Sequence, residues 1–190
     1  MGTLFSAILE AFGLSASAGL NAYIPLLVVS LLAKFTNLIH LASPWDALTS
    51  WWTIGVLIVL CIVEAVADKI PAVDHVNDAV QTFIRPTAGA ILFASTAGSA
   101  TDVNPILLMI CGLLVAGSVH TVKSAVVRPV VSATTASAGD PVVSFAEDIT
   151  AGFVSVLSVV LPIVTLVVII ILAIVIGLWI RRKKRARAEL

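Results

Sequence analysis

The sequence has few charged residues: they make up 12% of its 190 positions, while apolar residues make up 59%. Soluble domains carry about 25% charged and about 45–50% apolar residues, so this composition excludes an ordinary soluble domain and a disordered chain. Basic residues are scarcest: residues 1–180 hold five basic and ten acidic residues, whereas residues 181–190 hold six and one. A nucleic-acid partner is not expected, because the body of the chain offers no basic surface.

Cysteine and the common catalytic motifs are also scarce. Cys61 and Cys111 are the only cysteines, and both lie in apolar runs without a CxxC partner. We expect two buried apolar side chains, with neither a disulfide framework nor a zinc site. The sequence contains no GxSxG, HExxH or P-loop motif, so nothing in it favours an enzyme and we expect no cofactor. Glu10 interrupts the first apolar run, and we expect that run to belong to the mature protein.

Long apolar runs are what the sequence has in abundance. A membrane-spanning helix needs about 20 mostly apolar residues, and five uncharged runs approach or exceed this length: 11–33, 47–63, 86–101, 103–122 and 149–180. The last run holds 32 residues, and Pro162 within it predicts a turn or kink. The sequence therefore predicts an all-α, polytopic transmembrane bundle with six spans near 8–33, 49–67, 82–100, 104–127, 144–160 and 162–180.

Basic residues predict how these spans are oriented, because Lys and Arg collect in short cytoplasmic loops. The tail places a dense basic group in the cytoplasm: Arg181, Arg182, Lys183, Lys184, Arg185 and Arg187. With six spans, Lys69, Arg85, Lys123 and Arg128 fall on that same side, whereas five spans would place them outside. Six spans are favoured, with both termini cytoplasmic in a bacterial inner membrane. The tail also suits anionic lipid headgroups as partners.

The domain organisation follows from these spans. We expect one transmembrane domain over 1–180 and a basic tail over 181–190. Three crossings followed by three would give two halves of inverted topology, 1–101 and 102–180. Ala18-Gly19 and Ala116-Gly117 each lie in the span that opens a half, although two such pairs in this chain also fit coincidence. The composition is compatible with a homo-oligomer.

Polar residues near membrane depth are the candidate functional residues, because each costs about 2.5–3.5 kcal/mol on insertion scales. The densest group lies over 64–86. If the part after Pro71 is helical, then Asp74, Asp78 and Arg85 share one face with Gln81 or Thr82.

Two further groups and one amide complete the set. His120, Lys123 and Arg128 recur on nearly one helical face, and Glu147 and Asp148 begin the fifth span. Asn21 lies inside the first span. Gly13, Ser17 and Asn21 recur at four-residue spacing, which first indicates a packing face. Pro25 leaves a carbonyl near Asn21 without a donor, which also fits a broken helix that coordinates a substrate.

Three interpretations of these charges stay open. They form an interfacial network of salt bridges that holds the hairpins together, or they line a polar cavity open to the cytoplasm, or they carry chemistry at the interface. Asp74, Asp78, Glu147 and His120 have ligand types that suit a divalent metal, but carboxylates spaced by four residues are common on helices, so no metal is predicted.

The sequence favours a transporter or channel for a small solute or ion. Its predicted pathway consists of Asn21, Asp74, Asp78, Arg85, His120, Lys123, Arg128, Glu147 and Asp148. The alternative is a structural or lipid-binding membrane protein in which the same charges only clamp helices together. A water-filled cavity reaching Asp78 and Lys123 would favour transport, and direct ion pairs without a void would favour the clamp.

The ordered motifs resemble a known family. They are Gly13-Leu-Ser-Ala-Ser-Ala-Gly-Leu-Asn-Ala-Tyr23, Val73-Asp-His-Val-Asn-Asp78 with Thr82-Phe-Ile-Arg-Pro-Thr-Ala-Gly-Ala90, His120-Thr-Val-Lys-Ser-Ala-Val-Val-Arg128, and Glu147-Asp148. In this order they are similar to the bacterial membrane proteins grouped as domain of unknown function 4126 (DUF4126). The likeness extends to about Pro162, and the loop after Arg128 departs from the family pattern. The resemblance implies a membrane protein and no particular substrate.

Overall fold

The computed structural model describes residues 2–67, 71–127, 140–165, 167–171 and 174. Every regular element within these ranges is helical, which confirms the predicted all-α class. The elements are α1 (Gly2–Leu20), α2 (Tyr23–Phe35), the 3-10 helix η1 (Trp45–Thr49), α3 (Trp51–Ala67), α4 (Pro71–Ala97), α5 (Pro105–Val122), the π-helical turn η2 (Lys123–Val127) and α7 (Asp140–Val160). Helical backbone resumes at Pro162, after the predicted break.

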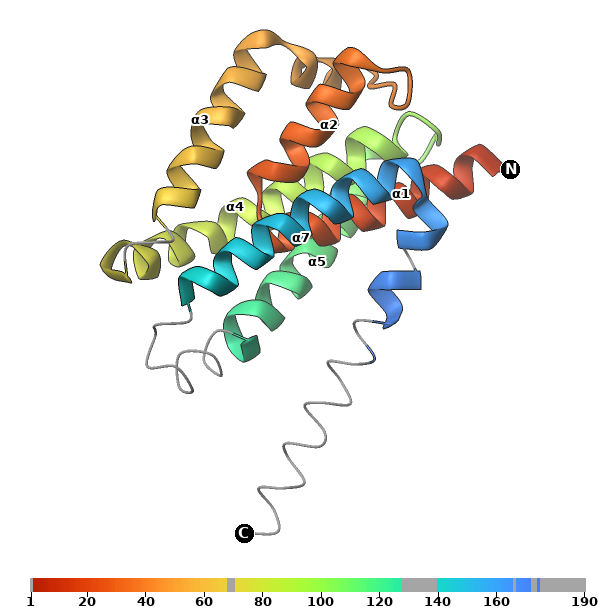
Figure 1. Cartoon of the computed structure of the whole chain (residues 1–190). Helices are drawn as coiled ribbons and strands as arrows, with labels where there is room; N and C mark the ends of the chain where they lie inside the picture. Colours follow the sequence, from red (N-terminus) through yellow and green to blue (C-terminus); the bar gives the residue numbers. More distant parts are fainter. Residues whose placement is uncertain (1, 68–70, 128–139, 166, 172–173, 175–190) are drawn as a thin grey trace.

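Helix α1 lies at the centre of the bundle, where it contacts α4, α5 and α7 (Figure 1). Helices α4 and α5 form the most extensive helix pair, joined by the short connection after Ala97. Helices α2 and α3 form a second pair, linked through η1, that flanks this bundle. The arrangement places the ends of α1, α3 and α5 and the beginnings of α2, α4 and α7 toward one end of the molecule.

The predicted first span, 8–33, is two helices rather than one. Helix α1 ends at Leu20 and α2 begins at Tyr23. The Asn21 side chain causes this division, because its Oδ1 atom accepts hydrogen bonds from the backbone N–H groups of Tyr23 and Ile24, both at 3.0 Å. Pro25 lies in the first turn of α2, where a missing N–H group is tolerated.

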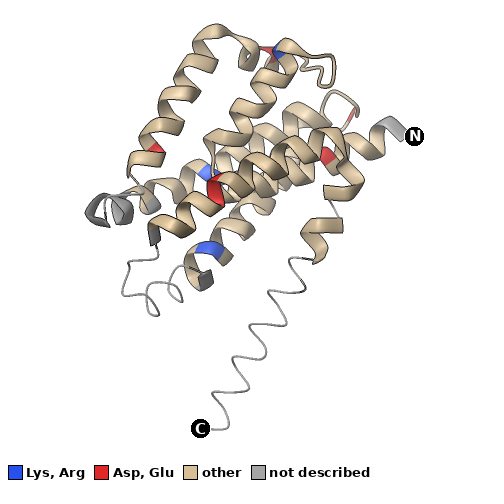
Figure 2. Cartoon of the chain, viewed as in Figure 1, with Lys and Arg blue, Asp and Glu red and all other residues tan. Residues whose placement is uncertain are grey.

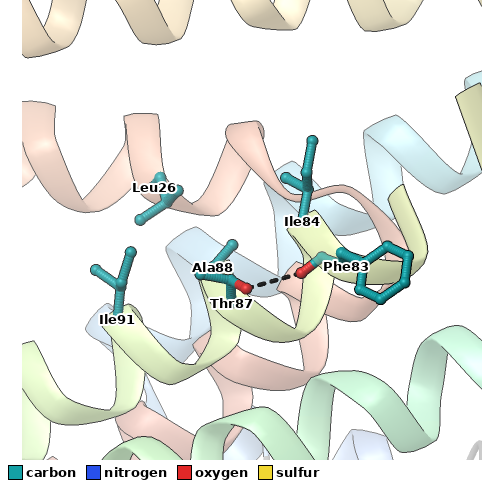
Figure 3. Close-up of a pocket in the computed structure, with 6 residues that line it drawn as sticks. All are labelled: Leu26, Phe83, Ile84, Thr87, Ala88 and Ile91. Atoms are coloured by element: carbon teal, nitrogen blue, oxygen red, sulfur yellow. Dashed lines mark hydrogen bonds between the residues drawn. The ribbon is translucent and has the colours of Figure 1, made fainter. Parts of the chain in front are cut away.

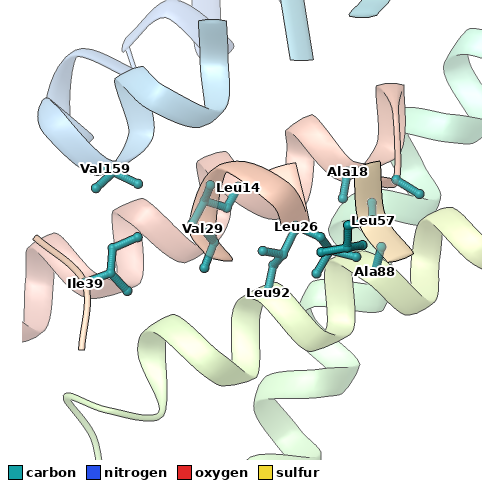
Figure 4. Packing of buried hydrophobic residues seen from close by; sticks show 11 residues of the cluster. Leu14, Ala18, Leu26, Val29, Ile39, Leu57, Ala88, Leu92 and Val159 are labelled. Atoms are coloured by element: carbon teal, nitrogen blue, oxygen red, sulfur yellow. The ribbon is translucent and has the colours of Figure 1, made fainter. Parts of the chain in front are cut away.

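The chain reverses direction at this break. Asn21, just after the end of α1, contacts Asp148 in the first half of α7. Ser17, one turn earlier on α1, contacts Ser155, further along α7. Helix α1 therefore runs antiparallel to α7. Along α2 the direction is opposite, because a Cβ atom on Gly152 would lie 3.6 Å from Ile24, near the start of α2. Ile39, beyond the end of α2, belongs to the same apolar cluster as Val159 (Figure 4). Helices α1 and α2 therefore form a V.

The other predicted spans agree more closely with the observed helices. Helix α4 starts at Pro71, about three turns before the predicted 82–100, and includes Pro86 in its interior. The backbone after Pro71 is therefore helical, as the predicted shared polar face requires. Two helices are long and apolar enough to cross a membrane, Pro105–Ala125 and Pro141–Val160, judged only by length and composition within the described part of the chain. Helices α1, α2 and α3 are shorter apolar helices.

The apolar core is built from small and medium side chains gathered around α1 and α2 (Figure 4). Leu14 and Val29 are fully buried at its centre, and Leu92 reaches them from α4. Glycine permits the closest helix crossing: a Cβ atom on Gly89 would lie 2.8 Å from the Gly112 carbonyl oxygen. A side chain at this position would push α4 away from α5.

Large apolar side chains lie on the outside of the described helices as well as in the core. The exposed residues on three helices include Trp51, Trp52, Val59, Ile62, Ile106, Leu107, Ile110, Leu114, Phe145, Ile149 and Phe153. The two cysteines depart from the prediction of burial, since Cys61 is half-buried and Cys111 is exposed.

Candidate functional site

Lys123 lies at the junction of α5 and η2 and joins α5 to both α1 and α7. Its Nζ atom is 2.6 Å from Glu147 Oε2, and only 3% of the Lys123 side chain is exposed. The same ammonium group donates a hydrogen bond of 3.0 Å to the Leu20 carbonyl oxygen. Leu20 is the last residue of α1, where carbonyl groups have no partner inside the helix and the helix dipole favours a cation.

Asn21 joins the α1–α2 break to α7. While its Oδ1 atom caps α2, its Nδ2 atom donates a hydrogen bond of 2.9 Å to Asp148 Oδ1. Asn21 is buried, and Asp148 is the sequence neighbour of Glu147 on α7. One amide therefore fixes both the position of the break and its distance from the two carboxylates of α7.

Glu64 and Arg85 form a second ion pair, between α3 and α4. Arg85 Nη2 lies 3.0 Å from Glu64 Oε1, and each side chain is only 1% exposed. Arg85 Nη1 lies 3.4 Å from His120 Nδ1, and His120 Nε2 lies 3.1 Å from Thr82 Oγ1. Because a guanidinium can only donate, His120 Nδ1 accepts here, and the ring carries its proton on Nε2, toward Thr82.

Gln81 and Tyr23 bring α2 into contact with this second pair. Gln81 is buried one helical turn before Arg85, and its side chain lies near the Tyr23 hydroxyl. Arg85 contacts His120, which lies one helical turn before Lys123, so the two ion pairs are near each other. Buried polar groups from α3, α4, α5 and α7 thus gather near the α1–α2 break.

Serine hydroxyls extend this polar region along α1. Ser17 Oγ donates to the Ala151 carbonyl oxygen at 2.7 Å and lies 2.8 Å from Ser155 Oγ. Ser15 Oγ donates to the Gly89 carbonyl oxygen at 2.9 Å, on the α4 side of the same helix. These bonds satisfy buried hydroxyls across helix interfaces, so the packing role expected for Ser17 is present together with the helix break.

An apolar cavity of about 250 Å³ lies between α2 and α4 (Figure 3). It is lined by Leu26, Phe83, Ile84, Thr87, Ala88 and Ile91. Its one polar side chain, Thr87, already donates a hydrogen bond of 2.8 Å to the Phe83 carbonyl oxygen. None of its lining residues belongs to the two ion pairs, so this cavity is separate from the polar region.

Six of the nine predicted pathway residues lie in this one region. Asn21, Arg85, His120, Lys123, Glu147 and Asp148 come together from α1, α4, α5, η2 and α7. The backbone of Asp74 and Asp78 belongs to α4, but their side chains lie outside the description, as does all of Arg128. The basic tail, residues 181–190, also lies outside the described residues.

Three residues of the region were not among those predicted: Glu64, Gln81 and Thr82. Glu64 had a usable signal, since it is a lone carboxylate at the end of an otherwise uncharged helix. The signal for Gln81 and Thr82 was weaker, because helical spacing alone did not decide which of them shares a face with Arg85. In the described residues, no group of three His, Cys, Asp or Glu side chains could hold a metal ion.

Burying these charges is costly. Figure 2 shows how sparse charged residues are on the described helices, so each buried charge has few possible ion-pair partners. Replacing a buried ion pair with well-packed apolar residues is often neutral or stabilising by about 1–4 kcal/mol, whereas removing one partner is strongly destabilising. Two buried pairs beside a helix break are therefore a poor way to gain stability, and they mark the region as a candidate functional site.

Comparison with known proteins gives one match. A family model described as "Domain of unknown function (DUF4126)" matches residues 8–183. Neither the curated proteins nor the solved structures contain a match. The matched range includes the α1–α2 break and both ion pairs.

Proposed function

The chain belongs to the DUF4126 family, and from its geometry we propose that it is a polytopic membrane protein that moves a small solute or ion through a polar site at the α1–α2 break. The observation that carries this proposal is the Lys123 ammonium, which is buried between the Glu147 carboxylate and the open end of α1. The family description names no activity, so the proposal rests on the site alone.

The distribution of side chains supports a bilayer environment. The outward faces of α3, α5 and α7 carry exposed Trp, Val, Ile, Leu and Phe side chains, while Arg85, Glu64 and Lys123 are buried. Water would favour the opposite distribution, whereas hydrocarbon favours apolar groups outside and paired polar groups inside. This distribution supports a membrane location, and the bacterial inner membrane predicted from the sequence stays part of our proposal.

The V formed by α1 and α2 changes the proposed topology. If Lys123 and the basic tail face the cytoplasm, as the positive-inside rule favours, the α1–α2 break beside Lys123 lies on the same side. The N-terminus of α1 then points to the external side, in place of the predicted cytoplasmic location. The absence of Lys and Arg before Lys34 fits an external N-terminus.

The helix ends that meet at the α1–α2 break support transport more than a clamp. Discontinuous helices present free carbonyl groups and a positive N-terminal end at a fixed point, and many transporters use them to hold substrates. Here the carbonyl at the end of α1 already holds a cation, the Lys123 ammonium. Glu147, Asp148 and Asn21 supply further oxygen and amide groups within the same layer.

The structural alternative also has an observation in its favour. Both ion pairs are direct contacts, at 2.6 and 3.0 Å, and the cavity between α2 and α4 is apolar. A protein that only clamps its helices would need nothing more than these contacts. In a transporter, the same contacts represent a closed state, from which the site opens when one ion pair separates.

Flux measurements in proteoliposomes test the proposal. We expect the wild-type chain to move at least one small ion or polar solute, and Lys123→Ala or Asp78→Asn to reduce that flux at least tenfold. Lys34→Ala is the matched control, because the Lys34 ammonium also donates to a backbone carbonyl, of Thr49 at 2.7 Å, but lies over Trp51 near the helix ends. If every candidate solute leaks equally through wild-type and protein-free vesicles, while Lys123→Ala lowers the melting temperature, the clamp is the better account.

A further inference from the structure

The groups around the Lys123 ammonium have the composition of a cation site. Lys123 Nζ contacts a carboxylate oxygen of Glu147 and the Leu20 carbonyl oxygen. The Asp148 carboxylate and the Asn21 side chain follow directly in sequence on the same two elements. Carboxylate and carbonyl oxygens are the ligands that hard metal cations take in proteins.

The open end of α1 adds to this preference. The last carbonyl groups of a helix carry a partial negative charge, which favours a cation at that end. The helix stops here because Asn21 caps α2 and so prevents α1 from continuing. The Leu20 carbonyl oxygen is therefore available to a side chain on another helix or to an ion.

The backbone at Lys123 is an independent sign that this position is unusual. Helix α5 ends at Val122, and the chain changes to a π-helical turn that begins at Lys123 itself. Single π-helical turns inside helices are uncommon and occur often at functional sites. The Lys123 N–H group still bonds to the Val119 carbonyl oxygen, so the winding changes at the residue whose ammonium contacts Leu20 and Glu147.

We propose that a monovalent metal cation, Na⁺ or K⁺, displaces the Lys123 ammonium and binds the Glu147 carboxylate and the Leu20 carbonyl oxygen. The inference deepens the proposed function by naming the substrate class of the same site. A monovalent ion that replaces one ammonium leaves the buried charge unchanged. A divalent ion would raise that charge by one and would need the Asp148 carboxylate as well, which the proposed site leaves bonded to Asn21.

Displacement of Lys123 also connects binding with movement. The ammonium joins η2 to both α1 and α7, so its release breaks the polar contact between η2 and the end of α1, while Gly19 of α1 still packs against Ala116 and Val119 of α5. Asn21 continues to hold the break against Asp148 when Lys123 leaves. The cation thereby weakens the α5 side of the site and keeps the α7 side intact.

Competition between the cation and Lys123 provides the test, in the full-length protein in nanodiscs. Tryptophan fluorescence reports the melting temperature while NaCl or KCl replaces choline chloride at constant ionic strength. We expect Na⁺ or K⁺ to raise the melting temperature of the wild-type protein in a saturable way. The midpoint concentration should fall at least tenfold in Lys123→Met, which removes the competitor, and the response should disappear in Glu147→Gln. Lys34→Met should keep the wild-type midpoint.

A second measurement needs no variant, in case Lys123→Met does not fold. Reductive methylation followed by mass spectrometry should modify Lys123 faster in NaCl or KCl than in choline chloride, with Lys34 in the same molecule as the reference. Equal rates for Lys123 in all three salts, or a wild-type melting temperature insensitive to both cations, would overturn the inference.

The two proposals fail in different ways. Cation binding with no flux of any ion or solute in proteoliposomes contradicts transport and leaves the cation site standing. Flux of a neutral or anionic solute that depends on Lys123, without any response of the melting temperature to Na⁺ or K⁺, contradicts the cation site and leaves transport standing.

Discussion

Glu64 and Arg85 form an ion pair of 3.0 Å between α3 and α4, with each side chain only 1% exposed. Arg85 also faces His120 on α5, so this one guanidinium joins three helices. Its position one turn after Gln81 on α4 places it in the apolar bundle rather than at a surface. Loss of its partner therefore leaves a charge that no solvent can reach.

The first prediction concerns this pair. Glu64→Gln should lower the free energy of unfolding by about 3–5 kcal/mol, because an unpaired guanidinium stays buried. The double variant Glu64→Leu with Arg85→Met should recover most of that loss, since apolar side chains suit the site. Unfolding in detergent, followed by tryptophan fluorescence, measures both. A double variant as unstable as the single one would show that the pair itself, rather than the uncompensated charge, sets stability.

The second prediction separates the two roles of Asn21. Asn21→Ala should destabilise the protein by about 1–2 kcal/mol from the lost helix cap and by a further 1.5–3 kcal/mol or so from the lost bond to Asp148. Asn104→Ala is the matched control, because Asn104 caps α5 at Ile106 N with a bond of 2.9 Å on the exposed surface. The difference between the two variants measures the contact with Asp148. Equal losses would mean that this contact adds nothing.

The third prediction concerns the crossing of α4 and α5. Gly112→Ala should destabilise the bundle by about 1–3 kcal/mol through overpacking, because its new Cβ atom would lie 2.6 Å from Phe93 Cβ. Gly55→Ala on α3 is the control, since nothing lies within 4 Å of its Cβ position. That change should stabilise α3 by about 0.5–1 kcal/mol through helix propensity. Thermal unfolding of both variants checks the contrast, which disappears if α4 and α5 do not cross at this point.

The fourth prediction concerns the proposed topology. In a variant with Cys61→Ala and Cys111→Ala, a cysteine introduced at Thr3 or Asp102 should react with a membrane-impermeant maleimide added outside intact cells. A cysteine introduced at Arg187 should react only after the cells are opened. The V formed by α1 and α2 requires this result, because it places Gly2 at the same end of the bundle as the α4–α5 connection. If Thr3→Cys reacts only after the cells are opened, the N-terminus lies in the cytoplasm and the proposed topology is wrong.

Several features followed from the sequence alone. The all-α class follows from apolar runs longer than a strand needs, and the helical face after Pro71 follows from the spacing of Asp74, Asp78 and Arg85. Much of the candidate site could also be predicted, since a charged side chain in an apolar chain needs a polar partner and the sequence has few other charged residues to provide one. Asn21 followed by Pro25 indicated a broken helix, although spacing alone favoured a packing face there.

Tertiary structure decided which charges meet. Spacing within a helix places residues on a face but does not say which helix lies opposite, so Lys123 had no assigned partner and Glu64 was absent from the predicted pathway. The reversal at Asn21 settles the neighbours: it brings the end of α1 to Lys123 and the start of α2 to Gln81. The sequence determined that the few charges near membrane depth need polar partners or water. Only the packing of α1 against α4, α5 and α7 decided the pairs, because partners come from helices far apart in the chain.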